Sequence, residues 1–228
     1  MKMVMHMKHV IFDLDGTLLD SVRVWEHLGI EFLNQRKIQS KIRPEQMDIE
    51  LEIRNLSEGA LYLKEEYDLE DSIEEIIDAM LQLVSHRYLA CDLKDPLYEK
   101  DVLHQLKADG SCLYVLTSSF EQLAKQCLEH HQVAHLFDAI ETISKGSSKA
   151  NGSAYETFLQ KHHISKADVI VVEDAYHAVV GVKSLGVKVI AMEEPYFEMN
   201  LKNKEIADAY VTNYQDLYTI IKRMQACK

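Results

Sequence analysis

Two aspartates stand directly after an apolar run near the start of the chain, in HVIFDLDGT from His9 to Thr17. An unpaired buried carboxylate is costly, so Asp13 and Asp15 imply a partner that balances their charge. Residues two apart in a strand point the same way, which predicts that both side chains face one site. One carboxylate can hold a metal ion and attack phosphorus while the other acts as a general acid. Taken alone, the pair could also be a turn or a helix cap.

Three further polar clusters follow apolar segments or precede a helix. They are Thr117 with Ser118, Lys149 in the loop KGSSKANGS, and Glu173 with Asp174. Each has a simpler explanation by itself, as a helix cap or a solvated loop lysine. Ligands of open α/β sheets bind at the carboxyl ends of the strands, so these clusters are expected to converge. Carboxylates suit magnesium, and a lysine with hydroxyls beside that metal suits a phosphoryl group.

The elements that would position these residues alternate between strands and helices. We expect strands at 9–14, 112–117, 139–143, 169–172, 187–192 and 209–212, with helices at 97–110, 119–131 and 153–163, a further helix ending at Gly186, and one after the last strand. Continuous apolar strands that alternate with helices are typical of a parallel sheet covered on both faces. The predicted fold class is therefore α/β, with a Rossmann-like core.

A helical segment interrupts this alternation after the first strand. Helices are expected at 22–36, from Pro44, from a cap at Ser57, and from a capping box at Ser72, where Ser-Ile-Glu-Glu begins an apolar stripe. We expect residues 21–92 to form an inserted all-helical cap domain. Residues 1–20 and 93–228 would then form the catalytic core.

The motif order DLDGTLLDS, LTS, a loop lysine and VIVVED resembles the haloacid dehalogenase superfamily of phosphohydrolases. It is most similar to the branch with a helical cap after the first strand, which includes phosphoglycolate phosphatase and β-phosphoglucomutase. The resemblance covers nearly the whole chain and is strongest in the core. It implies a magnesium-dependent phosphatase that hydrolyses a small phosphorylated metabolite through an aspartyl-phosphate.

The resemblance also implies roles for single residues. Asp13 would be the nucleophile, and Asp15 would protonate the leaving group and then activate water. Thr117 would hold a phosphate oxygen through its hydroxyl, with the Ser118 amide nearby. Lys149 would neutralise the charge of the nucleophile and of the phosphate.

Magnesium would be held by Asp13, the main-chain carbonyl of Asp15 and Asp174, with Glu173 close to the ion or bridging through water. The true dehalogenases of the superfamily lack the second aspartate, so Asp15 argues against dehalogenation.

Two motifs depart from the family pattern. The family often has Lys-Pro-x-Pro around the lysine, where this chain has Lys149-Ala-Asn-Gly152, and Lys145 is a second lysine in the loop. It often has Ser-x-x-Gly after the acidic pair, where this chain has Ala175-Tyr-His-Ala178. The missing serine would remove a hydroxyl contact near the metal. His177 could replace it or could be a solvated helix residue.

Two alternatives remain open at this level. A sugar-phosphate mutase would need a second phosphate site, for which Lys41, Arg43, Arg54 and Lys64 are candidates unless they are ordinary helix-surface charges. Thr17 favours hydrolysis over mutase activity. A non-catalytic phosphate-binding module is disfavoured by the intact set of acidic residues and lysine.

The net charge, the apolar runs and the cysteines limit the classes of binding partner and the expected location of the protein. The net charge of −12 argues against general nucleic-acid binding, which needs a basic surface. No apolar run approaches the length of about 18–20 residues that spans a bilayer, and the N-terminus has no apolar signal-peptide region. The four cysteines form no CxxC pair and are expected to be reduced in a cytoplasmic protein. The expected partner is a small phosphorylated metabolite, and the expected state is a monomer, with a dimer as the alternative.

Overall fold

The computed structural model describes residues 8–52, 54, 56–95, 98–193 and 200–226. The chain divides into two compact units. One comprises the chain up to Asp20 and from Asp92 onward, and the other comprises Ser21–Cys91. Each unit is described by itself below.

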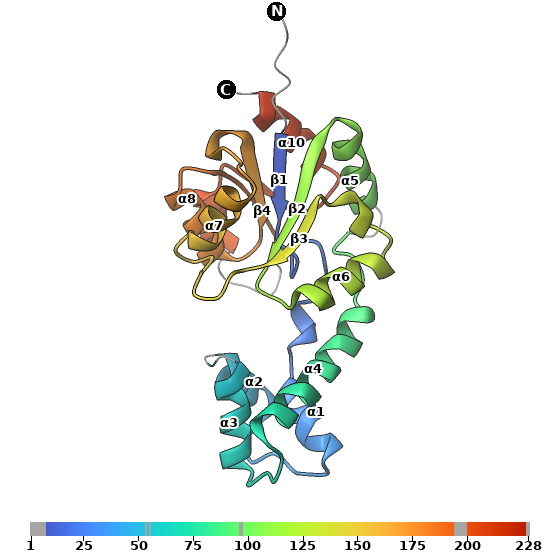
Figure 1. Ribbon diagram of the computed structural model, residues 1–228, viewed down its shortest axis with the longest axis vertical. Coiled ribbons are helices and arrows are strands. Elements are labelled where there is room, and N and C mark those ends of the chain that lie inside the picture. The colour runs from blue at the N-terminus through green and yellow to red at the C-terminus, as the bar shows by residue number, and fades with distance from the viewer. Residues whose placement is uncertain (1–7, 53, 55, 96–97, 194–199, 227–228) are drawn as a thin grey trace, which may run out of the picture. The chain divides into compact units, whose positions relative to one another are not determined.

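The first unit is built on a six-stranded parallel sheet (Figure 1). Its strands are β1 Lys8–Phe12, β2 Ser111–Thr117, β3 Ala139–Thr142, β4 Val169–Glu173, β5 Lys188–Met192 and β6 Ala209–Val211. Their spatial order is β3-β2-β1-β4-β5-β6, so β1 lies between β2 and β4. The predicted α/β class with a Rossmann-like parallel sheet is confirmed.

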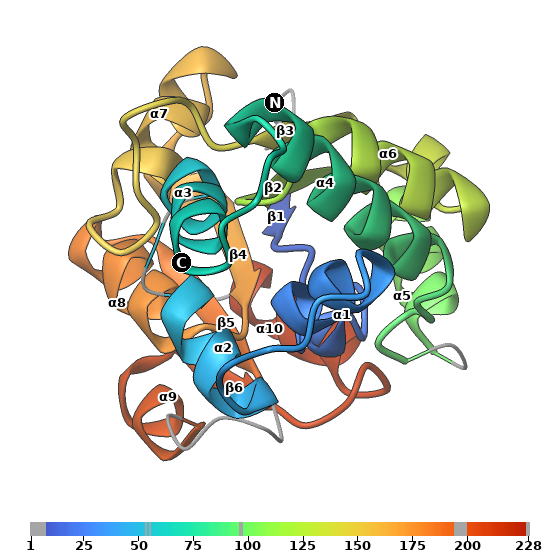
Figure 2. The same ribbon diagram turned by 90° about the horizontal axis from the view of Figure 1, so that it is seen from below.

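Helices cover both faces of this sheet (Figures 1 and 2). On one face, α7 Ser153–Lys161 and α8 Tyr176–Ser184 pack on the strands, and Phe158 and Val179 join Ile11, Val171 and Val189 in one apolar cluster. On the other face lie α5 Glu99–Ala108, α6 Glu121–His130 and α10 Leu217–Ala226. Every residue of β2 and β4 is buried, which explains why Cys112–Leu116 and Val169–Val172 are continuously apolar rather than alternating.

The first strand is shorter than predicted. It ends at Phe12, so the expected extension to Leu14 is wrong, and Asp13 and Asp15 lie in the loop that follows. The chain turns there because two successive amides bind the carbonyl of Leu14 and Gly16 adopts φ +78°. The alternation of strand residues therefore does not position the two aspartates, and the loop after β1 carries both of them.

The second unit is helical throughout its described part. It contains the short 3-10 turn Val22–Val24 and the helices α1 Leu28–Gln35, α2 Pro44–Glu52, α3 Leu56–Glu66 and α4 Ile73–Leu89. The capping box at Ser72 is confirmed, since its hydroxyl accepts from the backbone N–H of Glu75 and the Glu75 carboxylate returns to the Ser72 N–H. Ser57 is not a cap, because α3 already begins at Leu56.

The predicted helix over 22–36 is broken at His27. This residue adopts a left-handed φ of 56°, and its backbone N–H and ring Nδ1 bind the two carboxylate oxygens of Asp48 at 2.7 and 2.8 Å. Trp25 lies before this break and makes an edge contact with Tyr88, while remaining 37% exposed. A contact between residues far apart in sequence thus overrides the helical period of the segment.

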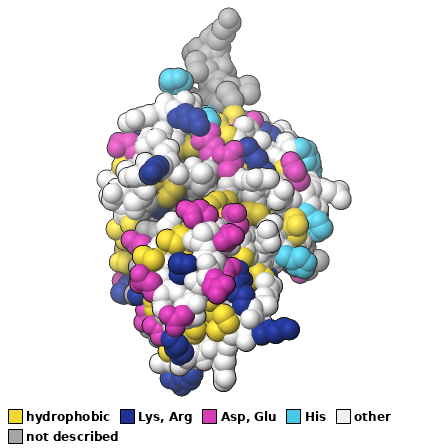
Figure 3. Space-filling model, turned by 60° about the horizontal axis from the view of Figure 1, so that its bottom comes forward, with side chains coloured by type: hydrophobic (Ala, Val, Ile, Leu, Met, Phe, Trp, Pro, Cys, Tyr) yellow, Lys and Arg dark blue, Asp and Glu magenta, His cyan; other side chains and the backbone are white. Residues whose placement is uncertain are grey.

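A short helix near the C-terminus, α9 Asn200–Ile206, was not expected from the sequence. None of the described helices has the length and apolar character that crossing a membrane requires. On the face shown in Figure 3, acidic and basic side chains are interspersed and form no broad patch of one sign.

A buried carboxyl lies at the start of α5. Glu99 is fully buried, and its Oε2 accepts a long hydrogen bond of 3.4 Å from the Asp95 amide. Its Oε1 has no partner among the described residues. Burial therefore raises the pKa of Glu99 well above its usual value, and the fold favours the protonated form.

We expect Glu99→Gln to stabilise the protein at pH 8 by about 1 kcal/mol. Because the folded-state pKa is raised, the wild type loses stability as pH rises above the unfolded-state value of about 4.3. The amide does not ionise, so the difference between the two proteins should shrink at pH 5. Urea unfolding at both pH values measures this, with the exposed Asp101→Asn in the same helical turn as the control. A variant no more stable than wild type at pH 8 would contradict the prediction.

Candidate active site

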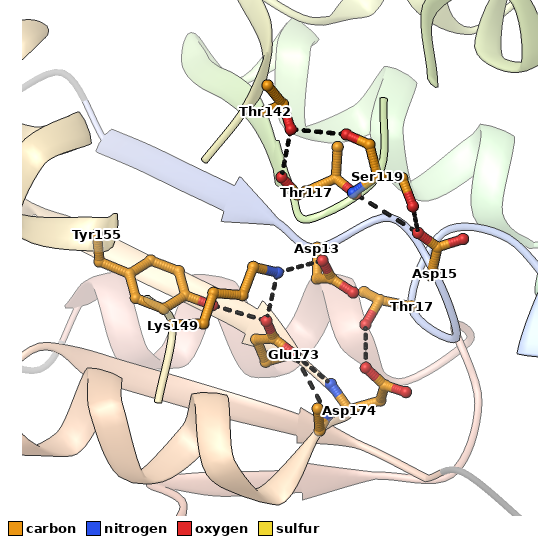
Figure 4. A network of polar contacts seen from close by, with 11 residues as sticks. Asp13, Asp15, Thr17, Thr117, Ser119, Thr142, Lys149, Tyr155, Glu173 and Asp174 are labelled. Carbon is orange, nitrogen blue, oxygen red and sulfur yellow. Dashed lines mark hydrogen bonds and ion pairs between the residues drawn. The ribbon is translucent and has the colours of Figure 1, made fainter. Parts of the chain in front are cut away.

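The predicted site residues gather at the carboxyl ends of β1, β2 and β4 (Figure 4). Two groups of direct contacts are present. Lys149 joins Asp13 to Glu173, and Asp15 joins Thr117 through hydroxyl contacts. Side chains that are far apart in the sequence are therefore brought to one edge of the sheet.

The buried lysine is the centre of the first group. The Nζ of Lys149 contacts Asp13 Oδ1 and lies 2.7 Å from Glu173 Oε1, and the side chain is only 6% exposed. Burial alone would lower its pKa, but the two carboxylates outweigh that effect and raise the pKa of Lys149. Lys145, in the same loop, is exposed. The structure thus places Lys149, not Lys145, at the aspartate.

Two glycines hold the lysine loop against α8. Gly152 has φ +79° and forms the N-cap of α7, so Ser153 is not the cap. A Cβ at Gly152 would lie 2.7 Å from the carbonyl oxygen of Gly181, and a Cβ at Gly181 would lie 1.9 Å from that of Lys149. Gly152 stands where the family pattern has its second proline, whose φ near −65° cannot reach this conformation. The loop therefore positions its lysine by close backbone packing.

Glu173 is a fully buried junction of hydrogen bonds. Its Oε1 accepts from Lys149 Nζ and from the hydroxyl of Tyr155 at 2.6 Å. Its Oε2 accepts from the amides of Asp174 at 3.1 Å and Ala175 at 3.2 Å. Burial would raise the pKa of Glu173, but contact with Lys149 reverses this and lowers it overall. Both oxygens are thus already engaged by donors of the chain itself.

The second group surrounds Asp15, which is half-buried. Its Oδ2 accepts from the hydroxyl of Ser119 at 2.5 Å and from that of Thr117 at 3.4 Å. The Thr117 hydroxyl also accepts from the Ser119 amide at 2.9 Å, and Thr142 holds the Ser119 carbonyl at 2.7 Å. Ser118 is exposed. Ser119 was not predicted, although the hydroxyl run Thr-Ser-Ser was the available signal.

Asp174 is held by two residues for which the sequence predicted no such contact. The hydroxyl of Thr17 donates to its Oδ1 at 3.4 Å, and Asn203 of α9 donates to its main-chain carbonyl at 2.5 Å. Tyr214 in turn binds the carbonyl of Thr17 at 2.8 Å. His177 is exposed, so it does not replace the missing serine. The contacts from Thr17 and Asn203 orient Asp174 instead.

The carboxylates suit a magnesium ion. Ligand oxygens of Asp13, Glu173 and Asp174 all lie within 4.8 Å of one another, and all three residues are buried. Magnesium prefers such hard oxygen donors. Burial and the charge of Glu173 raise the pKa of Asp13 to about 8, which reflects negative charge that Lys149 alone does not balance. A divalent cation would supply the missing balance, so the donor set fits the ion.

The chain resembles proteins of known name in sequence. The family model of haloacid dehalogenase-like hydrolases matches residues 10–192. Phosphoglycolate phosphatase of Aliivibrio fischeri is 27% identical over 199 residues, which cover 83% of this chain and 85% of that protein. Phosphoglycolate phosphatase of Vibrio cholerae is 26% identical over 191 residues, which cover 78% of this chain and 81% of that protein.

Solved structures share the fold. A protein provisionally named β-phosphoglucomutase, from Thermotoga maritima, superposes with a TM-score of 0.76 at 20% identity, covering 95% of this chain and 99% of that one. A variant of CbbY from Rhodobacter sphaeroides in complex with xylulose-1,5-bisphosphate gives a TM-score of 0.74 at 15% identity, covering 92% and 96%. The resemblance predicted from the motifs is confirmed, and the chain belongs to the family of haloacid dehalogenase-like hydrolases.

Proposed function

We propose that this protein is a magnesium-dependent phosphatase that hydrolyses a small phosphorylated metabolite through an aspartyl-phosphate. The observation that carries the proposal is the contact of Lys149 with Asp13, next to the carboxyl group of Asp15. Phosphoryl transfer to an aspartate requires three functional groups: a nucleophile, a cation and a second carboxyl group. The names of the two sequence relatives described above, both phosphoglycolate phosphatases, support the same class of reaction.

The proposed reaction has two steps. A carboxylate oxygen of Asp13 attacks phosphorus, and the bond from phosphorus to the leaving oxygen breaks while Asp15 gives that oxygen a proton. Asp15 then takes a proton from water, which attacks the same phosphorus and releases inorganic phosphate and free Asp13. Ser119 holds Asp15 during this exchange, and Lys149 offsets negative charge on the transferring group.

Magnesium would be held by Asp13, Asp174 and the main-chain carbonyl of Asp15, with Glu173 as a neighbour. When bound, it supplies Lewis-acid stabilisation of the phosphoryl oxygens. Thr17 and Asn203 orient Asp174 for this role, as described above.

We further propose that the helical unit is the cap that selects the substrate. Three of its candidate anion-binding side chains already have partners within that unit: Lys41 pairs with Glu66, Arg54 pairs with Glu50, and Lys64 binds the carbonyl of Leu69. Arg43 is exposed. These pairings support a surface role for most of the basic residues and favour a substrate with a single phosphate.

The test is phosphate release from p-nitrophenyl phosphate and a panel of metabolite phosphates, with magnesium or with EDTA. We expect EDTA to lower the rate at least about 100-fold, because removing the metal removes several kcal/mol of transition-state stabilisation. Magnesium should also raise the thermal unfolding midpoint, since the ion binds the folded state. A rate unchanged by EDTA would contradict the metal requirement. Interconversion of sugar phosphates without phosphate release would show that the protein acts as a mutase rather than as a phosphatase.

A further inference from the structure

We propose that Tyr155 is a positioning residue that directs the ammonium group of Lys149 toward Asp13, acting through Glu173. Its hydroxyl does not touch Asp13 or Lys149 in the contacts described and binds Glu173 Oε1 at 2.6 Å. The same oxygen accepts from Lys149 Nζ at 2.7 Å. The consequence for catalysis rests on the function proposed above, whereas the consequence for the position of Lys149 does not.

The geometry of the Glu173 carboxylate carries this inference. A carboxylate offers about four acceptor directions, two on each oxygen. The amides of Asp174 and Ala175 take those of Oε2, and Tyr155 takes one of the two on Oε1. One direction remains for Lys149. From there its Nζ also reaches Asp13 Oδ1, so the occupied direction decides where the lysine points.

The packing around Tyr155 keeps its hydroxyl in place. The side chain is 1% exposed and belongs to the apolar cluster between α7 and the sheet, which includes Phe158 and Val171. Its ring also lies 5.9 Å from the Lys149 ammonium, measured to the ring centroid. Phenylalanine would keep the ring, its packing and this cation contact. Tyr155→Phe therefore removes the hydroxyl alone.

Loss of that hydroxyl should open a second acceptor direction on Glu173 Oε1. Lys149 can then bind Glu173 without contacting Asp13, because the freed direction on Oε1 offers its ammonium group a second position. We expect a crystal structure of Tyr155→Phe to show Nζ displaced from Asp13 in at least part of the molecules. We also expect kcat to fall about 10- to 100-fold, as for other small misplacements of a catalytic group, with a smaller change in KM.

A matched control exists at the opposite end of the sheet. Tyr218 also donates its hydroxyl to a carboxylate over 2.6 Å, that of Asp109, next to the start of β2. Tyr218→Phe should leave both the position of Lys149 and kcat unchanged. Thermal unfolding of the three proteins checks that the folded state is retained.

Combining Tyr155→Phe with a substitution of Lys149 distinguishes a positioning role of Tyr155 from a general effect on packing. In a Lys149→Met background, Tyr155→Phe should cause no further loss of kcat, because both changes act through the same group. An equal further loss, or a Lys149 that keeps both contacts in the crystal structure of Tyr155→Phe, would overturn the proposal. If the wild type releases no phosphate from any substrate, the proposed function fails, and the crystal structures alone decide whether Tyr155 positions Lys149.

Discussion

Asp13→Asn is expected to lower the rate of phosphate release by at least about 10,000-fold, comparable to the loss of a nucleophile in other enzymes that form covalent intermediates. An amide oxygen does not attack phosphorus effectively, so no aspartyl-phosphate can form. The side chain keeps its shape, and Lys149 keeps Glu173 as a charged partner. The variant should therefore remain folded while losing activity.

The measurement is steady-state phosphate release at high enzyme concentration, with thermal unfolding as the check on folding. Asp20→Asn is the control, because it makes the same change in the same motif at an exposed carboxylate. It should retain the wild-type rate to within about twofold. A retained rate above a tenth of wild type in Asp13→Asn would remove Asp13 from the role of nucleophile.

Gly181→Ala is expected to lower the free energy of unfolding by about 2–3 kcal/mol, the usual cost of overpacking a tight contact. In an exposed helix the same change would gain about 1 kcal/mol from helix propensity. Here the new Cβ would lie 1.9 Å from the Lys149 carbonyl and 2.9 Å from the Gly152 amide, both backbone atoms. The loop must move, and Lys149 moves with it, so phosphate release should fall at least about tenfold.

Urea unfolding and phosphate release measured on the same preparations test this second prediction. Val180→Ala is the matched control, since it alters the neighbouring residue of α8 on its exposed side. Its free energy of unfolding should stay within about 0.5 kcal/mol of wild type. A Gly181→Ala protein as stable and as active as wild type would show that the loop accommodates the methyl group without moving its lysine.

The strands and the order of the motifs could be predicted because their signals are local. Continuous apolar runs such as Val169–Val172 mark buried strands, and polar residues directly after them mark the edge of the sheet where ligands bind. The capping box at Ser72 is equally local, since both of its hydrogen bonds span three residues. These features depend little on contacts with residues far away in the sequence.

The features that were missed depend on contacts between distant residues. The break at His27 follows from Asp48, and the placement of Asn203 follows from a short helix whose sequence, NLKNKEI, has little apolar periodicity. From the sequence, Tyr155 could be placed only by its spacing from Lys149, near the start of the following helix. The role of its hydroxyl depends on Glu173, which lies at the end of strand β4. Sequence spacing alone cannot reveal such pairs.

The position of β1 in the sheet has a consequence for how the protein is made. β1 is synthesised first, yet it pairs with β4, with His9 opposite Val169. At about 5–20 residues per second, a ribosome needs on the order of 10 s to produce the chain between them. The helices from Leu28 to Leu89 are complete well before that time. During synthesis the helical unit can therefore fold before β4 is available to pair with β1. Lys149, Glu173 and Asp174 join Asp13 in the candidate site only after that.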